Sequence, residues 1–407
     1  MTSAVDKCLS IADLQHLARR YLPRVIYDYL EGGADDEEAL EENAEAIRRH
    51  RLKPRYLVDI GTRSQQVTVF GKTYASPFGI GPMGMLGMVR HGGDVALAEV
   101  AAQAKVPFVL SGASNASIEA AAQAAPGAWL NYYPCKDARM EQGLLDRARH
   151  VGVETLVVTV DVPLHAKRER NIRSGWVRPY KPTAGVILES LRHPAWVAGY
   201  LRHGLPVMEN IQPHAPAGLD ARALTSFYAE QVPTRHQWAL VERLRKLWPG
   251  NLVLKGILSP EDALAAAAAG ADGVIVSNHG GRQLDRGVAA IDALPEVVHA
   301  AGHQLVVMFD SGIRRGADVA VALALGARMC FVGRAAAYGL AAGGAAGGKR
   351  ALDILRGELD LALGQIGCPN AHDLHGGFLW QAPPRTSTSS TASREPGRRA
   401  RQEQLAV

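Results

Sequence analysis

Cysteine is scarce in this sequence, and its few cysteines form no pattern that would indicate a metal site or a disulfide framework. Cys8, Cys135, Cys330 and Cys368 are far apart, and no C-x-x-C pair occurs. This usage is typical of a protein in a reducing compartment. We therefore expect a protein that has neither a metal site nor disulfide bonds.

Targeting and membrane-spanning segments are not found either. No charged n-region followed by an apolar h-region opens the chain, and no apolar run is long enough to span a bilayer. The net charge of +5 is small and the Lys and Arg residues are dispersed, which argues against nucleic acid as a partner. These absences favour a soluble, cytoplasmic globular protein.

Two common nucleotide-binding motifs are missing as well. There is no G-x-x-x-x-G-K-[ST], and no G-x-G-x-x-G follows a first strand. Neither a P-loop site nor a Rossmann nicotinamide site is therefore expected.

The sequence instead contains short apolar segments that alternate with alanine-rich helical segments. This alternation predicts an α/β protein with a parallel sheet, and eight such units predict a closed (β/α)₈ TIM barrel. The eight expected strands are Phe78–Ile80, Pro107–Leu110, Ala128–Leu130, Leu156–Thr159, Leu252–Leu254, Val274–Val276, Leu305–Met308 and Met329–Val332.

The residues before the first strand predict an N-terminal helical cap. Ser10 is expected to cap the first helix with Asp13 in its first turn, and the pair Gly32–Gly33 is expected to end the second. The segment from Arg55 to Lys72 carries short alternating stretches, which we expect to close one end of the barrel.

Two stretches interrupt the repeat. Residues 171–226, between the fourth and fifth strands, are too long for an ordinary connection and carry an apolar stripe around Trp196 with basic residues beside it. Such a segment can lie at a membrane surface, and a lid or a subunit contact is the alternative. Residues 381–407, rich in Ser, Thr, Arg and Pro, predict a disordered tail, so the barrel domain is expected to cover residues 1–380.

Polar or titratable residues follow each of the eight expected strands, and in a barrel these positions meet at one end. The segment Ser277–Asp285 follows the sixth strand and places His279 and Arg282 on a turn with two adjacent glycines. A histidine offers a base near neutral pH, and an arginine offers a planar pair of donors for a carboxylate. This segment therefore predicts proton abstraction from a small organic acid.

The last two strands are followed by a pattern typical of phosphate binding. Asp310, Gly312 and Arg314 follow the seventh strand, and Gly333 and Arg334 follow the eighth. The glycines after the first strand leave space for a planar heterocycle such as a flavin, beside which Lys255 would stabilise negative charge. A barrel aldolase or isomerase that binds a phosphorylated substrate, and a barrel without activity, remain alternatives.

These motifs, in this order, resemble the FMN-dependent L-2-hydroxy-acid dehydrogenases and oxidases. The resemblance runs from Tyr27 to about Pro369 and is closest to the bacterial (S)-mandelate dehydrogenase branch. It rests on Tyr27–Ala34, Ser114–Asn115, Asp161 with Arg168, Lys255, Ser277–Asp285, Asp310–Arg314 and Gln365–Pro369.

The resemblance implies FMN as the cofactor and assigns a role to each matching residue. His279 is implied to be the base, with Asp161 orienting it. Arg168 and Arg282 are implied to bind the substrate carboxylate, and Tyr29 and Tyr133 to hydrogen-bond the carboxylate and hydroxyl. The residues implied to contact FMN are Pro82, Met83, Gly84, Ser111, Asn131, Thr159, Lys255, Ser277, Asp310, Gly312, Arg314, Gly333 and Arg334.

Three positions depart from parts of that family. Asn131 stands where Gln is usual, Ala113 where glycolate oxidases carry a bulky aromatic, and Gly84 where oxidases tend to have Ala. The shorter Asn131 leaves its flavin contact open, whereas Ala113 favours a bulky (S)-2-hydroxy acid such as (S)-mandelate, and Gly84 favours a dehydrogenase that uses a quinone or another respiratory acceptor. L-lactate as substrate and O₂ as acceptor are the alternatives. The resemblance also implies a homotetramer, and the insertion predicts peripheral attachment to the cytoplasmic face of the inner membrane.

Overall fold

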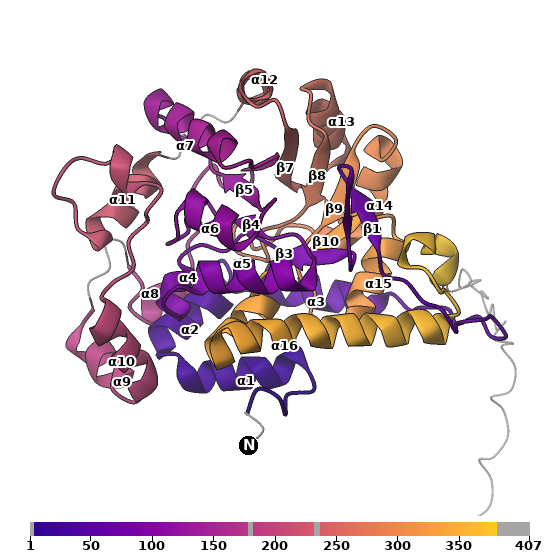
Figure 1. Cartoon of the computed structure of the whole chain (residues 1–407), viewed down its shortest axis with the longest axis horizontal. Helices are drawn as coiled ribbons and strands as arrows, with labels where there is room; N and C mark the ends of the chain where they lie inside the picture. Colours follow the sequence, from indigo (N-terminus) through magenta and orange to yellow (C-terminus); the bar gives the residue numbers. More distant parts are fainter. Residues whose placement is uncertain (1–3, 178–181, 232–236, 381–407) are drawn as a thin grey trace, which may run out of the picture.

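The computed structural model describes residues 4–177, 182–231 and 237–380, so the expected tail at 381–407 lies outside the described residues. Its centre is a sheet of eight parallel strands in the order β3-β10-β9-β8-β7-β6-β5-β4 (Figure 1). The N–H of Ile80 donates to the carbonyl of Pro107 at 2.9 Å and joins the first strand to the second, which closes the barrel. The predicted (β/α)₈ barrel is therefore confirmed. The strands are β3 (Phe78–Ile80), β4 (Val109–Leu110), β5 (Trp129–Tyr132), β6 (Thr155–Thr159), β7 (Asn251–Ile257), β8 (Gly273–Val276), β9 (Val306–Phe309) and β10 (Met329–Val332).

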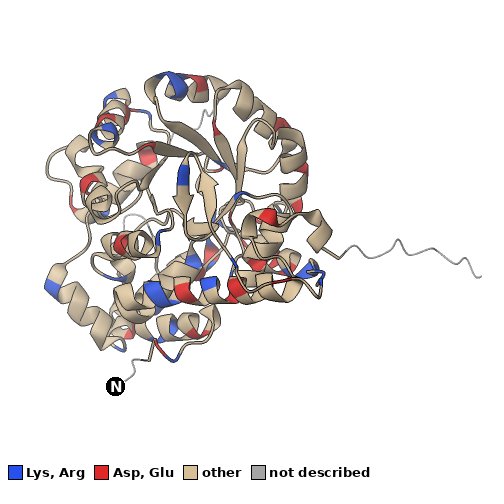
Figure 2. Ribbon diagram, turned by 45° about the vertical axis from the view of Figure 1, so that its right-hand side comes forward, with Lys and Arg blue, Asp and Glu red and all other residues tan. Residues whose placement is uncertain are grey.

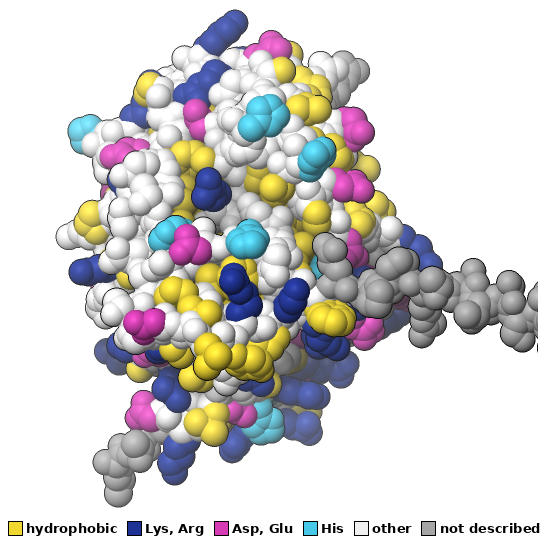
Figure 3. Space-filling view, turned by 90° about the vertical axis from the view of Figure 1, so that its right-hand side faces the viewer, with side chains coloured by type: hydrophobic (Ala, Val, Ile, Leu, Met, Phe, Trp, Pro, Cys, Tyr) yellow, Lys and Arg dark blue, Asp and Glu magenta, His cyan; other side chains and the backbone are white. Residues whose placement is uncertain are grey.

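Helices surround these strands, and most of the charged residues lie on the helices and loops rather than on the sheet (Figure 2). On the face shown in Figure 3, acidic and basic side chains are distributed over the surface together. The main surrounding helices are α5 (Gly93–Ala104), α6 (Ile118–Ala124), α7 (Ala138–His150), α12 (Trp238–Leu247), α13 (Pro260–Ala268), α14 (Ala290–Ala301), α15 (Gly316–Ala324) and α16 (Arg334–Ile366).

A hairpin of β1 (Val67–Val69) and β2 (Lys72–Tyr74) closes the N-terminal end of the barrel. Val69 is 2% exposed and packs against the inward-facing side chains of the barrel, among them Trp129 and Ile275. The expectation that the segment from Arg55 to Lys72 closes one end is confirmed, because these apolar residues continue the barrel core into the hairpin.

Three helices form the N-terminal cap: α1 (Ile11–Tyr21), α2 (Arg24–Glu31) and α3 (Glu38–Arg49). Ser10 caps α1 in a capping box with Asp13, and α2 ends at Gly32, as expected. Helix α1 lies alongside α16 (Figure 1), and the N–H of Ala34 donates to the carbonyl of Gly281 at 2.9 Å. The cap is therefore joined to the loop that follows β8.

The insertion between β6 and β7 extends beyond the predicted residues 171–226 at both ends. It contains α8 (Glu169–Arg173), α9 (Ala184–Ser190), α10 (Pro194–His203), the short helix η1 (Gln212–His214) and α11 (Ala221–Gln231). In Figure 1, α9 and α10 lie together at the lower left, outside the ring of helices. Trp196 on α10 donates its indole N–H to the carbonyl of Met88 at 2.8 Å, which holds α10 against α4 (Leu86–Val89). No described helix combines the length and the apolar character needed to cross a bilayer.

Candidate active site

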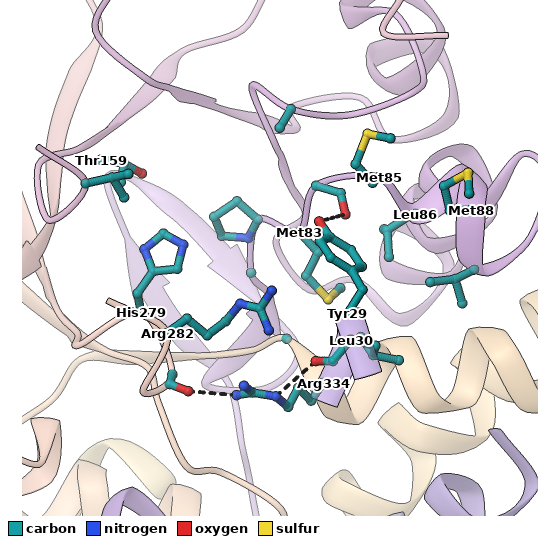
Figure 4. Close-up of a pocket in the computed structure, with 18 of the residues that line it drawn as sticks. Tyr29, Leu30, Met83, Met85, Leu86, Met88, Thr159, His279, Arg282 and Arg334 are labelled. Carbon is teal, nitrogen blue, oxygen red and sulfur yellow. Dashed lines mark hydrogen bonds between the residues drawn. The ribbon is translucent and has the colours of Figure 1, made fainter. Parts of the chain in front are cut away.

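A cavity of about 260 Å³ lies at the C-terminal end of the barrel. In Figure 4, His279 and Arg282 lie on one side of the cavity, and Tyr29 and Met83 lie across from them. Most of the expected site residues line it, although they come from loops far apart in the sequence. They are Tyr29, Pro82, Met83, Gly84, Tyr133, Thr159, Arg168, Lys255, His279, Arg282, Asp310, Gly312, Arg314, Gly333 and Arg334.

The remaining expected residues do not line the cavity, but each hydrogen-bonds to a residue that does. They therefore form a second layer that orients the lining side chains. The pairs are Ser111 with Ala113, Asn131 with Thr159, Asp161 with His279, and Ser277 with Lys255.

His279 is oriented by a carboxylate. Its ring nitrogen Nδ1 lies 2.9 Å from Oδ1 of Asp161, and its backbone N–H donates to Oγ of Ser277 at 3.1 Å. The backbone of His279 has φ of 59°, a strained conformation for a non-glycine residue. The carboxylate favours the tautomer that carries the proton on Nδ1, which leaves Nε2 able to accept a proton.

The electrostatics of this pair favour a neutral imidazole beside an ionised carboxylate. Burial lowers the pKa of His279, and the opposing charge of Asp161 does not fully offset it. Burial alone would raise the pKa of Asp161, but His279 and then Lys255 outweigh burial and hold that pKa below its ordinary value. His279 is therefore a base at neutral pH, and Asp161 can stabilise the imidazolium once a proton has been taken.

Two guanidinium groups lie next to the histidine. Nη1 of Arg282 donates to the carbonyl of Gly32 at 2.6 Å, and its guanidinium carbon lies 5.4 Å from the ring centroid of Tyr29. Arg168 donates from Nε to the carbonyl of Arg282 at 3.1 Å. Burial, and then the charge of Arg168, lowers the pKa of Arg282 to about 9, so Arg282 remains cationic at neutral pH.

A second cationic group lies at the ends of β9 and β10. Arg334 donates from Nη1 to the carbonyl of Gly280 at 2.9 Å and from Nη2 to the carbonyl of Gly32 at 3.1 Å. Burial, and then the positive charge of Arg282, lowers the pKa of Arg334 to about 10. In the described part of the chain, Arg282, Arg314 and Arg334 make no ion pair with a carboxylate. Since three partly buried cations close together are costly without a counter-charge, the arrangement favours a bound anion.

Sequence reasoning missed part of the cavity lining, namely the residues that the insertion contributes. Trp176, Leu205, Met208, Thr225 and Tyr228 all line the cavity. Their only signal in the sequence was the length of the insertion, because no local motif indicates which residues of a long connection return to the site.

Comparisons with known proteins agree with this geometry. The chain matches the FMN-dependent dehydrogenase family over residues 18–381. The chain belongs to the FMN-dependent dehydrogenase family. It is 41% identical to an (S)-mandelate dehydrogenase of Pseudomonas putida over 371 residues, which is 91% of this chain and 93% of the relative. It is 36% identical to an L-lactate dehydrogenase of Pseudomonas syringae pv. syringae over 375 residues, which is 92% of this chain and 98% of the relative.

Among solved structures, it is similar to a crystal structure of a monotopic membrane protein, (S)-mandelate dehydrogenase. The TM-score is 0.89 with 39% sequence identity, and the match covers 92% of this chain and 100% of that chain. As a member of an FMN-dependent dehydrogenase family, this protein is an oxidoreductase, and the aldolase, isomerase and inactive-barrel alternatives are discarded.

The residues of the cavity fit FMN, the cofactor of this family. Arg314, Arg334 and the N-terminus of α16 offer positive charge for a phosphate. Asn131 uses its amide N–H groups on Thr159 and Val157, and its buried Oδ1 has no partner among the described residues. An N–H of a bound flavin would satisfy that oxygen. The shorter Asn side chain at this position is therefore compatible with a flavin contact.

Lys255 lines the cavity as expected, but it lies within a strand rather than directly after one. We expected a strand that ends at Leu254, but β7 continues to Ile257, with an irregularity between Lys255 and Ile257 where Gly256 has φ of 107°. Lys255 is 4% exposed, and its Nζ lies 3.1 Å from Oδ2 of Asp310. Burial lowers the pKa of Lys255, but Asp310 and Asp161 more than offset this, so the pKa is raised and the side chain is a permanent cation.

Proposed function

We propose that this protein oxidises an (S)-2-hydroxy acid with a bulky side group, such as (S)-mandelate, to the 2-oxo acid. The observation that carries the proposal is the position of His279, held by Asp161, beside two guanidinium groups in one cavity. This arrangement can bind a carboxylate and accept a proton from the adjacent hydroxyl group. The likeness to (S)-mandelate dehydrogenase supports the aryl substrate.

In the proposed mechanism, Arg168 and Arg282 bind the substrate carboxylate and fix the orientation of the neighbouring carbon. Nε2 of His279 accepts the proton. Tyr133 donates a hydrogen bond to the substrate, and burial raises the pKa of Tyr133, which keeps it a neutral donor. Tyr29 hydrogen-bonds the substrate by exchanging its present bond to the carbonyl of Gly84. When bound, FMN supplies the two-electron acceptor.

We propose that the FMN phosphate is bound by Arg314, Arg334 and the backbone around Gly312 and Gly333. Lys255 would lie at the end of the flavin that gains negative charge on reduction. Of the other expected flavin contacts, Thr159 lines the cavity, whereas Ser111, Asn131 and Ser277 lie in the layer behind it and support the lining residues. Pro82, Met83 and Gly84 supply a surface of small and apolar groups along the ring.

Two small residues, Gly84 and Ala113, line the cavity near Tyr29, and their small size supports a bulky side group on the substrate. A Cβ atom added to Gly84 would lie 2.9 Å from Cβ of Ala113 and 3.6 Å from Oη of Tyr29. Two small residues therefore stand together at this part of the wall, where any enlargement reduces the cavity. L-lactate, which has only a methyl group, remains the second candidate substrate.

The test is anaerobic mixing of the purified, FMN-loaded protein with a panel of 2-hydroxy acids. We expect (S)-mandelate to bleach the flavin absorbance faster than L-lactate, and (R)-mandelate to leave it unchanged. The reduced protein is then mixed with oxygen or with a soluble quinone, and faster reoxidation by the quinone identifies a dehydrogenase. Absence of bleaching by every 2-hydroxy acid would overturn the proposal, and faster reaction with oxygen would identify an oxidase.

We also propose that the insertion attaches the protein to a membrane surface and thereby brings it close to a quinone. Four large apolar side chains on or next to helices α9 and α10 are exposed to solvent. They are Ile187 (53% exposed) and Leu188 (67%) on α9, Leu191 (59%) directly after α9, and Leu201 (76%) on α10. Exposed apolar side chains of this size are typical of membrane-contacting surfaces. The likeness to a monotopic membrane protein supports this assignment.

A vesicle flotation assay tests the attachment. Point substitutions are preferable to deletion of the segment, because Trp196 on α10 hydrogen-bonds to Met88 in the cavity wall. Leu188→Ser with Leu201→Ser should release the protein from vesicles that contain anionic lipid, whereas Leu264→Ser, at an exposed leucine of α13, should not. Equal flotation of all variants would reject the proposed surface. A homotetramer, implied by family resemblance, is tested by the mass of the protein in detergent.

A further inference from the structure

Two aromatic rings of the insertion contact the two tyrosines of the proposed substrate site. The ring of Trp176 lies 4.5 Å from the ring of Tyr29, centroid to centroid, with an interplanar angle of 31°. The ring of Tyr228 lies 6.4 Å from the ring of Tyr133 at 87°, an edge-to-face contact. Both distances are within the range in which aromatic pairs attract and orient one another.

The contact of Trp176 completes the surroundings of Tyr29. The guanidinium carbon of Arg282 lies over the Tyr29 ring, 5.4 Å from the ring centroid. The hydroxyl group of Tyr29 donates to the carbonyl of Gly84 at 3.1 Å. The tyrosine itself comes from α2 of the N-terminal cap. Trp176, which follows α8, belongs to the insertion, and its contact restricts the orientation of the Tyr29 ring.

The contact of Tyr228 depends on a close approach of chain segments. Tyr228 is 9% exposed and lies on α11. A Cβ atom at Gly112 would lie 2.9 Å from Oη of Tyr228 and 3.3 Å from Cδ2 of Tyr133, so glycine allows both rings to reach this place. One face of α11 supplies the cavity lining, since Ala221, Thr225, Tyr228 and Ala229 recur at helical spacing.

We propose that Trp176 and Tyr228 are positioning residues, and that docking of the insertion onto the barrel completes the substrate pocket by fixing Tyr29 and Tyr133. The inference rests on the proposed function for the role of the tyrosines. His279 and Arg282 come from the loop after β8, and Arg168 comes from the start of the connection after β6, directly before α8. The insertion supplies the aromatic contacts that hold the hydroxyl donors in place, which couples the surface segment to substrate binding.

The experiment compares ring removal with ring retention in the FMN-loaded full chain. Trp176→Leu and Tyr228→Leu remove the contacts, whereas Trp176→Phe and Tyr228→Phe keep a ring. The measurements are the calorimetric Kd of phenylacetate, an inert acid, and KM and kcat for (S)-mandelate. We expect the Leu variants to raise Kd and KM about tenfold and to lower kcat less than about threefold, and the Phe variants to restore wild-type binding.

Tyr200→Leu is the matched control, because Tyr200 stacks on Trp196 in the same insertion and does not line the cavity. It should leave Kd and KM unchanged. Gly112→Ala serves if a Leu variant loses its flavin, since its added methyl group would press on both rings and on the carbonyl of Asn131 without removing a ring, and it should also raise Kd.

Unchanged binding in the Leu variants, equal losses in Tyr200→Leu, or failure of the Phe variants to restore binding would each overturn the proposal. In the Gly112→Ala variant, an unchanged Kd would do the same. Because phenylacetate binding needs no turnover, these outcomes are distinct from failure of the proposed oxidation, which is judged by flavin bleaching in the wild-type protein.

Discussion

Nδ1 of His279 lies 2.9 Å from Oδ1 of Asp161, although 118 positions separate the two residues in the sequence. Asp161 follows β6 and His279 follows β8, and both strands pair with β7. Parallel pairing brings their C-terminal ends to the same end of the barrel. The base and its carboxylate therefore depend on the correct assembly of three strands.

His279→Gln should retain bound FMN and lose about 10² to 10⁴ in the rate of flavin reduction, because the base is removed while the phosphate site is untouched. Stopped-flow absorbance under anaerobic conditions measures the rate, and the flavin-to-protein ratio serves as the control for folding. A rate within a few-fold of the wild type would remove His279 from its proposed role.

Arg282→Lys should raise KM for the hydroxy acid about tenfold or more, because a lysine cannot present two parallel N–H donors to a carboxylate. Arg286→Lys is the matched control, since Arg286 lies on the same loop and pairs with Glu38 at the surface. Equal KM values in the two variants would contradict carboxylate binding by Arg282.

The pH dependence of kcat/KM should have two limbs between about pH 5 and pH 10. Burial lowers the pKa of His279 below its ordinary value of 6.5, so activity should rise as the pH increases through a midpoint below 6.5. Arg282, with a pKa lowered by burial to about 9, should give the alkaline limb as it loses its charge.

Asp161→Asn provides the internal check on the acid limb. The carboxylate of Asp161 raises the pKa of His279 against the effect of burial, so its removal should move the acid midpoint to still lower pH while the overall rate falls. An acid midpoint that shifts upward would show that another group controls this limb.

Arg314→Met should weaken FMN binding about 10- to 100-fold, because a charge-assisted hydrogen bond to the phosphate is lost, while the affinity for riboflavin should not change. Fluorescence titration of the apoprotein with each flavin measures both affinities. Arg315→Met is the control, since Arg315 pairs with Glu358 at the surface. Equal losses for FMN and riboflavin would argue against a phosphate contact.

The strands and most of the site could be predicted from the sequence because their signals are local. Apolar runs indicate buried strands, and polar residues directly after them, such as His279 and Arg314, must meet at one end of a closed barrel. Lys255 lines the cavity as expected, but the end of its strand was predicted too early, because the irregularity at Gly256 extends β7 in a way that no hydrophobic pattern reveals. Trp176 and Tyr228 were missed because their positions depend on how a long insertion packs.

The hairpin that closes the far end of the barrel has a kinetic consequence. Val69 and the barrel core fill that end, so the described residues leave no entrance to the cavity through the barrel interior. We therefore expect the hydroxy acid and the electron acceptor both to enter from the C-terminal end of the barrel, each after the other has left. Steady-state measurements at several acceptor concentrations should accordingly give parallel lines in double-reciprocal plots.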